Sequence, residues 1–445
     1  MYDVLIIGGG LSGLAAGVKL ASEGLRVSLF ERKHYLGGRC YSYEDTKIGE
    51  IVDNGQHVLI GAYHQLLHYL DIIETKHYLR KESHLRLPLF HPQKGFTDFH
   101  IKYLPKPFNL INGIFGFPFL SETEKIRMIK LGIKIWKSSN EHEENLSNMT
   151  ISQWLDENKQ SDTAKRNFWY PVAVSIMNEI PERASALLFF RSLKKALFGN
   201  TSDSAILIPK VNQYELYAQN AITYLKRRRC NVNLNAEVHS IMIKGNKVTG
   251  IKLSDNKIVK CKTVICAVPY YNVIRLIPEY FHECEPFLNF VKFEPSPIIS
   301  YHLWFENAFT DVDYVGCIDF NLQWIFNRRV IFGEQAKKPF YITCVISGAH
   351  KYINLKKDEL IKIALADLYK IFPESRNSRL VRSTIIKERR ATFSATPDTE
   401  KIRPSTKTPI QGFFLAGDWT DTGLPATIEG AVLSGFRAAD IAKTF

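Results

Sequence analysis

The 445-residue sequence predicts an α/β fold built on a parallel sheet, because an apolar strand, a glycine turn and a helix follow one another at each end of the chain. At the N-terminus, Val4-Leu5-Ile6-Ile7 is a continuous apolar run with glycines directly after it, as in a strand buried on both faces. At the C-terminus, Phe413-Phe414-Leu415 leads through Gly417-Asp418 into a helix-like stretch that starts after Pro425. The length allows two or three domains.

The composition is that of a folded globular protein with an excess of basic residues. Hydrophobic residues make up 45% of the chain and charged residues 23%, which argues against a disordered chain. The net charge of +13 favours an anionic partner such as a phospholipid surface or a phosphorylated substrate. Because we find no RNA-binding or zinc-finger pattern, we expect no nucleic-acid partner.

The cysteines and the N-terminus favour a cytoplasmic protein. Seven cysteines are scattered without a CxxC pair, so we expect neither a metal site nor a disulfide framework. A strand begins at Tyr2 with no charged or cleavable leader before it. The apolar run 4–21 contains glycines, Ser12 and Lys19, which predicts a strand, a turn and a helix instead of a membrane span. No other stretch is predicted to span a bilayer.

The N-terminal turn carries the spacing GxGxxG at Gly8, Gly10 and Gly13. In that arrangement the first glycine makes a tight turn, the second lets the backbone approach a pyrophosphate, and the third lets the helix pack on the strand. The strand 26–30 follows, and Glu31 at its tip is placed to reach a ribose hydroxyl. We therefore predict dinucleotide binding, with a purely structural turn as the alternative. The predicted contacts also include Leu11, Ser12 and Arg32.

A second glycine pair, Gly37-Gly38, precedes Arg39. Backbone and guanidinium can reach the same diphosphate from its other side there, because the planar donor fork of arginine matches it. This GGRxxS element, which ends at Ser42, resembles the second fingerprint of the flavin amine oxidase and carotenoid desaturase superfamily. The resemblance implies FAD, bound non-covalently, as the cofactor. The alternative is a hairpin turn with a surface arginine.

The resemblance also implies a Rossmann-like cofactor domain that is discontinuous in sequence. In the superfamily the backbone at the position of Val238 meets the adenine, and the residue at the position of Asp418 contacts the ribityl chain. The helix start after Pro425 directs free N–H groups at the pyrimidine edge of the flavin. The further contacts predicted there are Gly417, Thr427 and Ile428. We expect an FAD-binding domain at residues 1–66, 208–275 and 390–445, and an inserted α+β substrate-binding domain at 67–207 and 276–389.

Two longer stretches, 53–63 and 417–431, resemble one branch of this superfamily. That branch is the squalene-associated FAD-dependent desaturases, also called hydroxysqualene dehydroxylases. Its usual Asn-Thr-Pro-Pro is replaced here by Asn178-Glu179-Ile180-Pro181. The resemblance implies reductive removal of the hydroxyl of hydroxysqualene to give squalene, with hydride from reduced flavin. Because no second nucleotide motif appears, the reducing equivalents are expected from an external electron donor.

Candidate catalytic residues lie in the segment 53–57, which in the superfamily passes against the flavin ring. We expect His57 to protonate the leaving hydroxyl, because its unperturbed pKa of ~6.5 suits proton donation near neutrality. Asp53 is expected either to orient His57 or to cap a turn, and Gly55 and Gln56 to contact the cofactor. In the alternative, Gln56 and His57 only hydrogen-bond the flavin and shape its pocket.

The region 104–137 is the candidate membrane contact. Its first part, 104–120, is aromatic and is broken by proline and glycine. A basic helical stretch follows, and the two together can adhere to an anionic leaflet from which an apolar substrate is loaded. The alternative is a cap over a substrate tunnel with a solvated basic face. The basic residues of the stretch are Lys125, Arg127, Lys130, Lys134 and Lys137.

Three other functions are compatible with parts of this pattern. A phytoene-type carotenoid desaturase shares the scaffold and runs the flavin in the opposite redox direction. An amine oxidase is less favoured, because the sequence carries no signature of an aromatic cage. A non-catalytic escort that binds a prenyl chain is the alternative of a different class. The intact residues Gly8, Gly10, Gly13, Glu31, Arg39 and Asp418 argue against such an escort.

Overall fold

The first lobe is organised around a five-stranded parallel sheet whose order is β10-β2-β1-β14-β20. The structure is a computed structural model that describes residues 2–82, 85–101, 108–138 and 140–445. The strands are β1 (Val4–Ile7), β2 (Val27–Phe30), β10 (Asn231–Asn233), β14 (Val264–Cys266) and β20 (Phe413–Leu415). They come from three separated parts of the chain, which we propose as the three segments of one cofactor domain.

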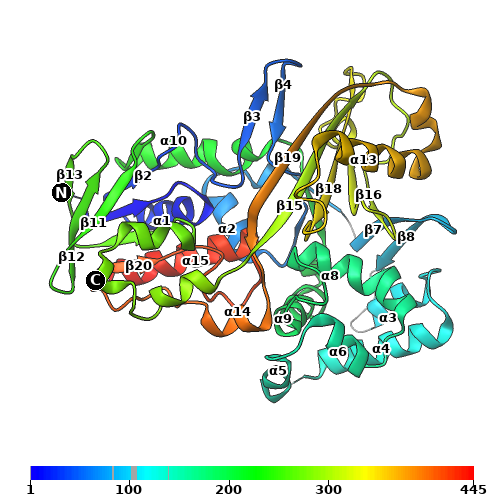
Figure 1. Cartoon of the computed structure of the whole chain (residues 1–445), viewed down its shortest axis with the longest axis horizontal. Helices are drawn as coiled ribbons and strands as arrows, with labels where there is room; N and C mark the ends of the chain where they lie inside the picture. The colour runs from blue at the N-terminus through cyan, green and yellow to red at the C-terminus, as the bar shows by residue number, and fades with distance from the viewer. Residues whose placement is uncertain (1, 83–84, 102–107, 139) are drawn as a thin grey trace.

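Helices α1 (Leu11–Ser22) and α15 (Ile428–Ala442) pack together against this sheet (Figure 1). They approach closely because Gly435 faces the backbone of α1: a Cβ atom at Gly435 would lie 2.2 Å from the Ser12 carbonyl oxygen. Helices α2 (His64–Ile72) and α10 (Asn220–Arg227) complete this core. A small antiparallel sheet with a hairpin turn at Gly245 lies beside it. Its strands are β11 (Val238–Lys244), β12 (Lys247–Leu253) and β13 (Ile258–Lys260).

A seven-stranded sheet of order β19-β15-β18-β17-β16-β7-β8 forms the second lobe, at the right of Figure 1. Neighbouring strands are antiparallel except for the parallel pair β16 and β7. The strands are β7 (Leu85–His91), β8 (Gly95–Ile101), β15 (Pro295–Phe305), β16 (Tyr314–Cys317), β17 (Trp324–Asn327), β18 (Phe340–Ser347) and β19 (Leu380–Phe393). Side chains alternate between the faces of a strand, so Tyr301 on β15 packs under α13 (Lys357–Ile371) while Ser300 and His302 point to the opposite face.

A layer of helices lies below this sheet in Figure 1. These helices are α3 (Phe108–Phe115), α4 (Glu122–Trp136), α5 (Asn140–Leu146), α6 (Ile151–Glu157), α7 (Asp162–Ala164), α8 (Tyr170–Met177) and α9 (Ala186–Phe198). The remaining short helices are α11 (Tyr270–Val273), α12 (Arg328–Ile331) and α14 (Pro397–Ile402). Among the described residues, no helix has the length and apolar character that crossing a membrane requires.

The hairpin of β3 (Ser42–Asp45) and β4 (Glu50–Asp53) is tied to the second lobe by three ion pairs. Asp45 accepts from Arg382 on β19 at 2.7 Å, Glu50 pairs with Arg329 on α12, and Asp53 pairs with Arg328 at 2.8 Å. The segment after the hairpin is therefore held between the two lobes. A small sheet of β5 (Leu59–Ile60), β9 (Ile206–Pro209) and β6 (Leu79–Lys81) follows it.

Candidate active site

A cavity of about 1150 Å³ starts at the carboxyl ends of β1, β2, β14 and β20 and extends between the second lobe and the helical layer. Ligands of open parallel sheets bind at this edge, because the loops and helix N-termini there provide free backbone N–H groups. Of the predicted site residues, Gly13 and Asp53 do not line the cavity. The other predicted site residues all line it, namely Gly8, Gly10, Leu11, Ser12, Glu31, Arg32, Gly37, Gly38, Arg39, Gly55, Gln56, His57, Val238, Gly417, Asp418, Thr427 and Ile428.

The start of α1 fits a diphosphate. No side chain caps this helix and its first turn carries no acidic residue, so the positive end of the helix dipole is available to an anion. Gly13 lies directly behind the turn, where a Cβ atom would come within 2.0 Å of the Gly8 carbonyl oxygen. It contributes by allowing close packing and not by contact with a ligand. At the end of β2, the Glu31 carboxylate accepts from the backbone N–H of Gly9 at 2.8 Å and of Lys33 at 2.9 Å.

Arg39 brings the two motifs at opposite ends of the chain together. Its Nη2 donates to Oδ1 of Asp418 at 2.6 Å, across 379 positions in sequence, and its Nη1 donates to the carbonyl oxygen of Ala391 at 2.6 Å. Burial acts to lower the pKa of Arg39, but the charge and hydrogen bond of Asp418 outweigh it and raise that pKa. A guanidinium and a carboxylate side by side suit a diphosphate and a polyol respectively. We propose these as the roles of Arg39 and Asp418.

The N-terminus of α15 forms the next part of the wall. Thr427 caps the helix by accepting from the backbone N–H of Gly430 at 3.1 Å, and Thr427 and Ile428 line the cavity. Glu429 faces away from the cavity and is buried, where it accepts from the backbone N–H of Leu66 and pairs with Lys195 at 3.0 Å. It therefore anchors α2, and Lys195 balances its charge in the first turn of α15. A flavin pyrimidine edge, which gains negative charge on reduction, fits this wall.

The segment 54–57 lies where the cofactor end of the cavity meets its second arm. Asp53 is fully engaged behind it, because its carboxylate accepts from the Ser42 hydroxyl at 2.7 Å and pairs with Arg328 at 2.8 Å. In the described part of the chain, no hydrogen bond joins Asp53 to His57. Arg328 also donates to Oε1 of Gln56 at 2.7 Å. This buried arginine therefore holds both Asp53, directly before the segment, and Gln56 within it.

The pKa of His57 differs from the sequence-based expectation. Burial is the main cause that lowers it to about 4, the nearby charge of Arg39 lowers it further, and the charge of Asp53 partly opposes both. Nδ1 of His57 is buried and has no hydrogen-bond partner among the described residues. The imidazole is therefore neutral at pH 7, because the fold lowers its pKa from the unperturbed ~6.5, and its role as proton donor stays a prediction. His57 can still donate or accept one hydrogen bond in the cavity.

The second arm of the cavity is lined by hydrocarbon side chains, which the sequence interpretation did not single out. They come from β7, β8, the helices α3, α4, α8 and α9 and the helical turn 165–169 before α8, and include Phe99, Ile114, Met128, Phe168, Leu193 and Phe198. The described residues of these elements contribute no Asp, Glu, Lys or Arg to the wall. Such residues appear in a sequence as an ordinary apolar helix face. Only the packing of the helices decides whether they meet one another or line a space.

The predicted membrane contact divides between the cavity wall and the surface. Residues 104–107 lie outside the described residues. In the rest, α3 and α4 line the arm through residues such as Ile114 and Met128, and they expose Phe115, Ile126 and Trp136. Ile133 lines the cavity and is also 37% exposed, so the arm opens to the surface at α4.

Residues 178–181, which differ from the usual Asn-Thr-Pro-Pro, make hydrogen bonds of their own. Asn178 adopts a left-handed conformation with φ of 51° and lines the cavity. Glu179 is fully buried, where its carboxylate accepts from the backbone N–H of Ile180, from His350 Nε2 at 2.8 Å and from the Ser394 hydroxyl. The glutamate thus joins the end of α8 to the second lobe.

The comparisons agree with this geometry. A family model described as flavin containing amine oxidoreductase matches residues 11–442. The chain is 27% identical over 441 residues to a hydroxysqualene dehydroxylase of Zymomonas mobilis, covering 98% of each chain. It is 23% identical over 449 residues to a 15-cis-phytoene desaturase of Synechococcus elongatus, covering 97% of this chain and 94% of the relative.

Solved structures show the same fold. An oxidoreductase from Methanosarcina mazei superposes with a TM-score of 0.76 at 19% identity, covering 98% of this chain and 99% of the other. A putrescine oxidase bound to putrescine superposes with a TM-score of 0.74 at 18% identity, covering 100% of this chain and 99% of the other. The predicted α/β fold class is confirmed.

Proposed function

This chain belongs to the flavin containing amine oxidoreductase family and is an FAD-dependent oxidoreductase, and we propose that it removes the hydroxyl of hydroxysqualene reductively to give squalene. In more general terms, we propose that the substrate is a long isoprenoid. The dehydroxylases and desaturases among the relatives support it, since both kinds are similar to this chain over nearly its whole length.

The hydrocarbon arm is the observation that carries the proposal. A long apolar chain gains about 0.8 kcal/mol for each methylene group that it buries, and this arm offers it a wall made mostly of apolar side chains. A protonated amine would require a carboxylate there, because an unpaired buried charge is strongly unfavourable. The arm provides none from the described residues of its helices and strands. The structure therefore favours an isoprenoid over an amine, although amine oxidases share the fold.

In its fully reduced form the bound FAD would supply both the hydride and the proton with which the hydroxyl leaves as water. The chain has to orient the alcohol carbon, exclude water and stabilise the leaving hydroxyl. We propose that His57 hydrogen-bonds this hydroxyl as a neutral imidazole, because its pKa of about 4 rules out a standing positive charge at pH 7. We propose that Asp53 acts through Arg328, which holds the segment 54–57 in place. An external electron donor is part of the same proposal.

The experiment is an anaerobic incubation of the FAD-loaded, chemically reduced protein with hydroxysqualene. We expect squalene to form while the flavin is reoxidised in equal amount. A parallel incubation of the oxidised protein with phytoene tests the desaturase, the main alternative. If the protein forms no squalene but desaturates phytoene, the dehydroxylase proposal is wrong and the isoprenoid proposal stands. If it does neither while holding FAD, both are wrong.

We also propose that α3 and α4 bind a membrane surface. The exposed apolar side chains Phe115, Ile126 and Trp136 lie near the opening of the arm, and exposed lysines accompany them on α4. Apolar side chains that enter the headgroup region, together with lysines worth about 1 kcal/mol each at an anionic surface, would give reversible binding. The lysines are Lys130 and Lys134 on the helix and Lys137 directly after it.

Sedimentation with vesicles tests this membrane proposal. We expect the protein to bind phosphatidylglycerol vesicles more than phosphatidylcholine vesicles, and the double variant Ile126→Ser/Trp136→Ser to lose most of that binding. Val291 is a matched control, because it is 83% exposed on a segment that packs against β20. Equal losses from Val291→Ser and from the double variant would contradict a specific role for α4.

A further inference from the structure

The segment between β20 and α15 carries flavin-side wall residues at both of its ends. It begins with Gly417 and Asp418 and ends with Thr427, all of which line the cavity. No helix or strand spans the stretch between them, so its backbone carbonyl groups need donors from elsewhere in the protein. The source of those donors decides where the two ends of the segment lie.

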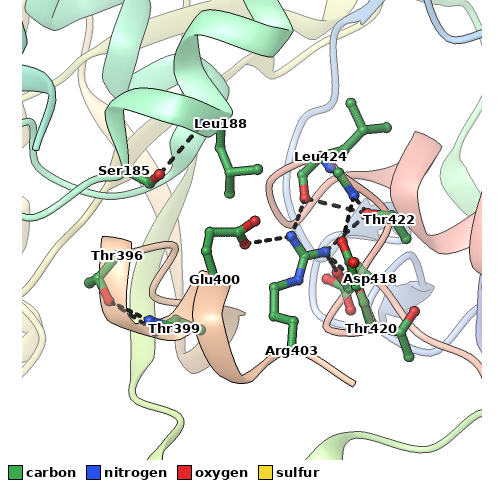
Figure 2. A network of polar contacts seen from close by, with 12 residues as sticks. Ser185, Leu188, Thr396, Thr399, Glu400, Arg403, Asp418, Thr420, Thr422 and Leu424 are labelled. Atoms are coloured by element: carbon green, nitrogen blue, oxygen red, sulfur yellow. Dashed lines mark hydrogen bonds and ion pairs between the residues drawn. The ribbon is translucent and has the colours of Figure 1, made fainter. Parts of the chain in front are cut away.

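One buried arginine provides many of these donors. Arg403, at the end of α14, points its guanidinium at the segment from outside the cavity (Figure 2). Its Nη2 donates to the carbonyl oxygens of Asp418, at 3.0 Å, and of Thr420. Its Nη1 donates to the carbonyl oxygen of Leu424 at 2.9 Å. The same Nη2 lies 3.0 Å from Oγ1 of Thr422, so a single side chain contacts the segment at four positions.

The charge of this arginine is compensated locally. Its side chain is completely inaccessible to solvent, and Nη1 donates to Oε1 of Glu400 at 2.6 Å. Burial raises the pKa of Glu400, and the neighbouring Arg403 charge opposes that rise. The guanidinium also lies 4.9 Å from the ring centre of Phe393, a residue of the cavity wall. Only the planar fork of an arginine reaches these diverging acceptors at once, because a lysine ammonium is a compact point charge.

We propose that Arg403 is a positioning residue for FAD: by fixing the segment 416–427, it sets the affinity and the reduction potential of the flavin. It acts on Asp418 through the carbonyl group of that residue and on the start of α15 through Leu424. The proposal requires that the chain binds FAD, and it does not depend on the substrate. An experiment can therefore contradict this proposal without contradicting the dehydroxylase proposal, and the reverse.

The test compares FAD-loaded Arg403→Gln with the parent protein. We expect FAD to bind about 10- to 100-fold more weakly, because hydrogen bonds from a charged donor to several carbonyl groups are lost. We also expect a more negative flavin midpoint potential, because the α15 N-terminus no longer lies in place to stabilise the reduced flavin. Flavin fluorescence on dilution measures the affinity, and equilibration with reference dyes measures the potential. Arg403→Lys is expected to fall between the two.

Three further variants separate positioning from general loss of stability. Lys165→Gln removes a buried, ion-paired cation that contacts Asp156 and not this segment. We expect it to lower the melting temperature and to leave the FAD affinity and potential unchanged. Glu400→Gln keeps an acceptor for Arg403 but removes its counter-charge, so we expect lower stability with the FAD affinity and potential of the parent. Thr422→Val removes one acceptor with little change in shape, and it remains testable if Arg403→Gln does not fold.

Clear outcomes would overturn the proposal. Unchanged FAD affinity and potential in Arg403→Gln would do so, and so would unchanged values in Thr422→Val where Arg403→Gln does not fold. Equal losses in Lys165→Gln would show that any buried cation has the same effect. Equal losses in Glu400→Gln would assign the effect to the ion pair and not to the carbonyl contacts.

Discussion

A side chain at position 132 should obstruct the hydrocarbon arm without harming the fold. Gly132 lies on α4 on the same helix face as Met128 and Ile135, which are buried and line the arm. A Cβ atom built there meets no other atom within 4 Å, so a larger side chain extends into open space. The variant Gly132→Leu is therefore expected to fold, and to gain roughly 0.8 kcal/mol from the better helix propensity of leucine.

The expected loss of substrate binding is much larger than this gain. A leucine side chain adds about four carbon atoms and displaces about as many methylene groups of a bound chain. At about 0.8 kcal/mol each, this amounts to roughly 3 kcal/mol, or on the order of a hundredfold in kcat/KM. FAD binding should stay unchanged, because the cofactor end of the cavity is built from other elements.

The assay is kcat/KM for hydroxysqualene, measured together with flavin absorbance and thermal unfolding. Gly132→Ala is the matched control, since it gives a similar helix gain with a side chain too small to fill the arm. Gly132→Leu that folds, holds FAD and forms squalene with the kcat/KM of Gly132→Ala would refute the assignment of the arm to the substrate.

Three further predictions concern the buried polar groups around segment 54–57. Because the pKa of His57 is about 4, the pH profile of kcat should be flat from pH 6 to 8, and an inflection near pH 6.5 that is absent in His57→Gln would contradict the neutral imidazole. Arg328→Met should lower the free energy of unfolding in urea by about 3–5 kcal/mol, because it leaves the Asp53 carboxylate buried and unpaired; Asp53→Asn in the same chain should recover part of this loss. His302 is buried with its Nδ1 2.7 Å from the Tyr341 hydroxyl, and burial is the main cause that lowers its pKa to about 3. Its unfolded form takes up a proton below pH ~6.5 while its folded form does not, so stability should fall from there toward pH 3, and less steeply in His302→Gln.

The local motifs were predictable because each depends on neighbouring residues. The glycine spacing after β1 and the Gly-Asp at the end of β20 determine their turns within a few positions, and both turns lie at the cavity. The pKa of His57 was not predictable, because burial follows from how the two lobes enclose it. The roles of Arg328 and Arg403 were not predictable either, since each arginine meets its main-chain or side-chain partners through the fold and not through a spacing motif.

The arm shows a second limit of sequence interpretation. The apolar residues of α4 have the spacing of a helix that packs against a core, and Met128 and Ile135 are indeed buried. The sequence does not show whether these side chains pack against other side chains or face an open cavity. The glycine at position 132 was the one local hint, because a helix interior rarely uses glycine without a packing or functional reason.

The order of the parallel sheet has a consequence for protein synthesis. β20 joins beside β14, and the pairing of Arg39 with Asp418 closes the rim, so the first and last parts of the chain meet around the cofactor. While the ribosome is still making the middle of the chain, β14 has an open edge where β20 will pair, and open strand edges attract other chains. On the proposed role of Asp418, firm capture of FAD waits until residue 418 and α15 have emerged. In the cell, tight flavin binding would then report that translation has passed α15, and fragments that stop earlier would be left to chaperones and proteases.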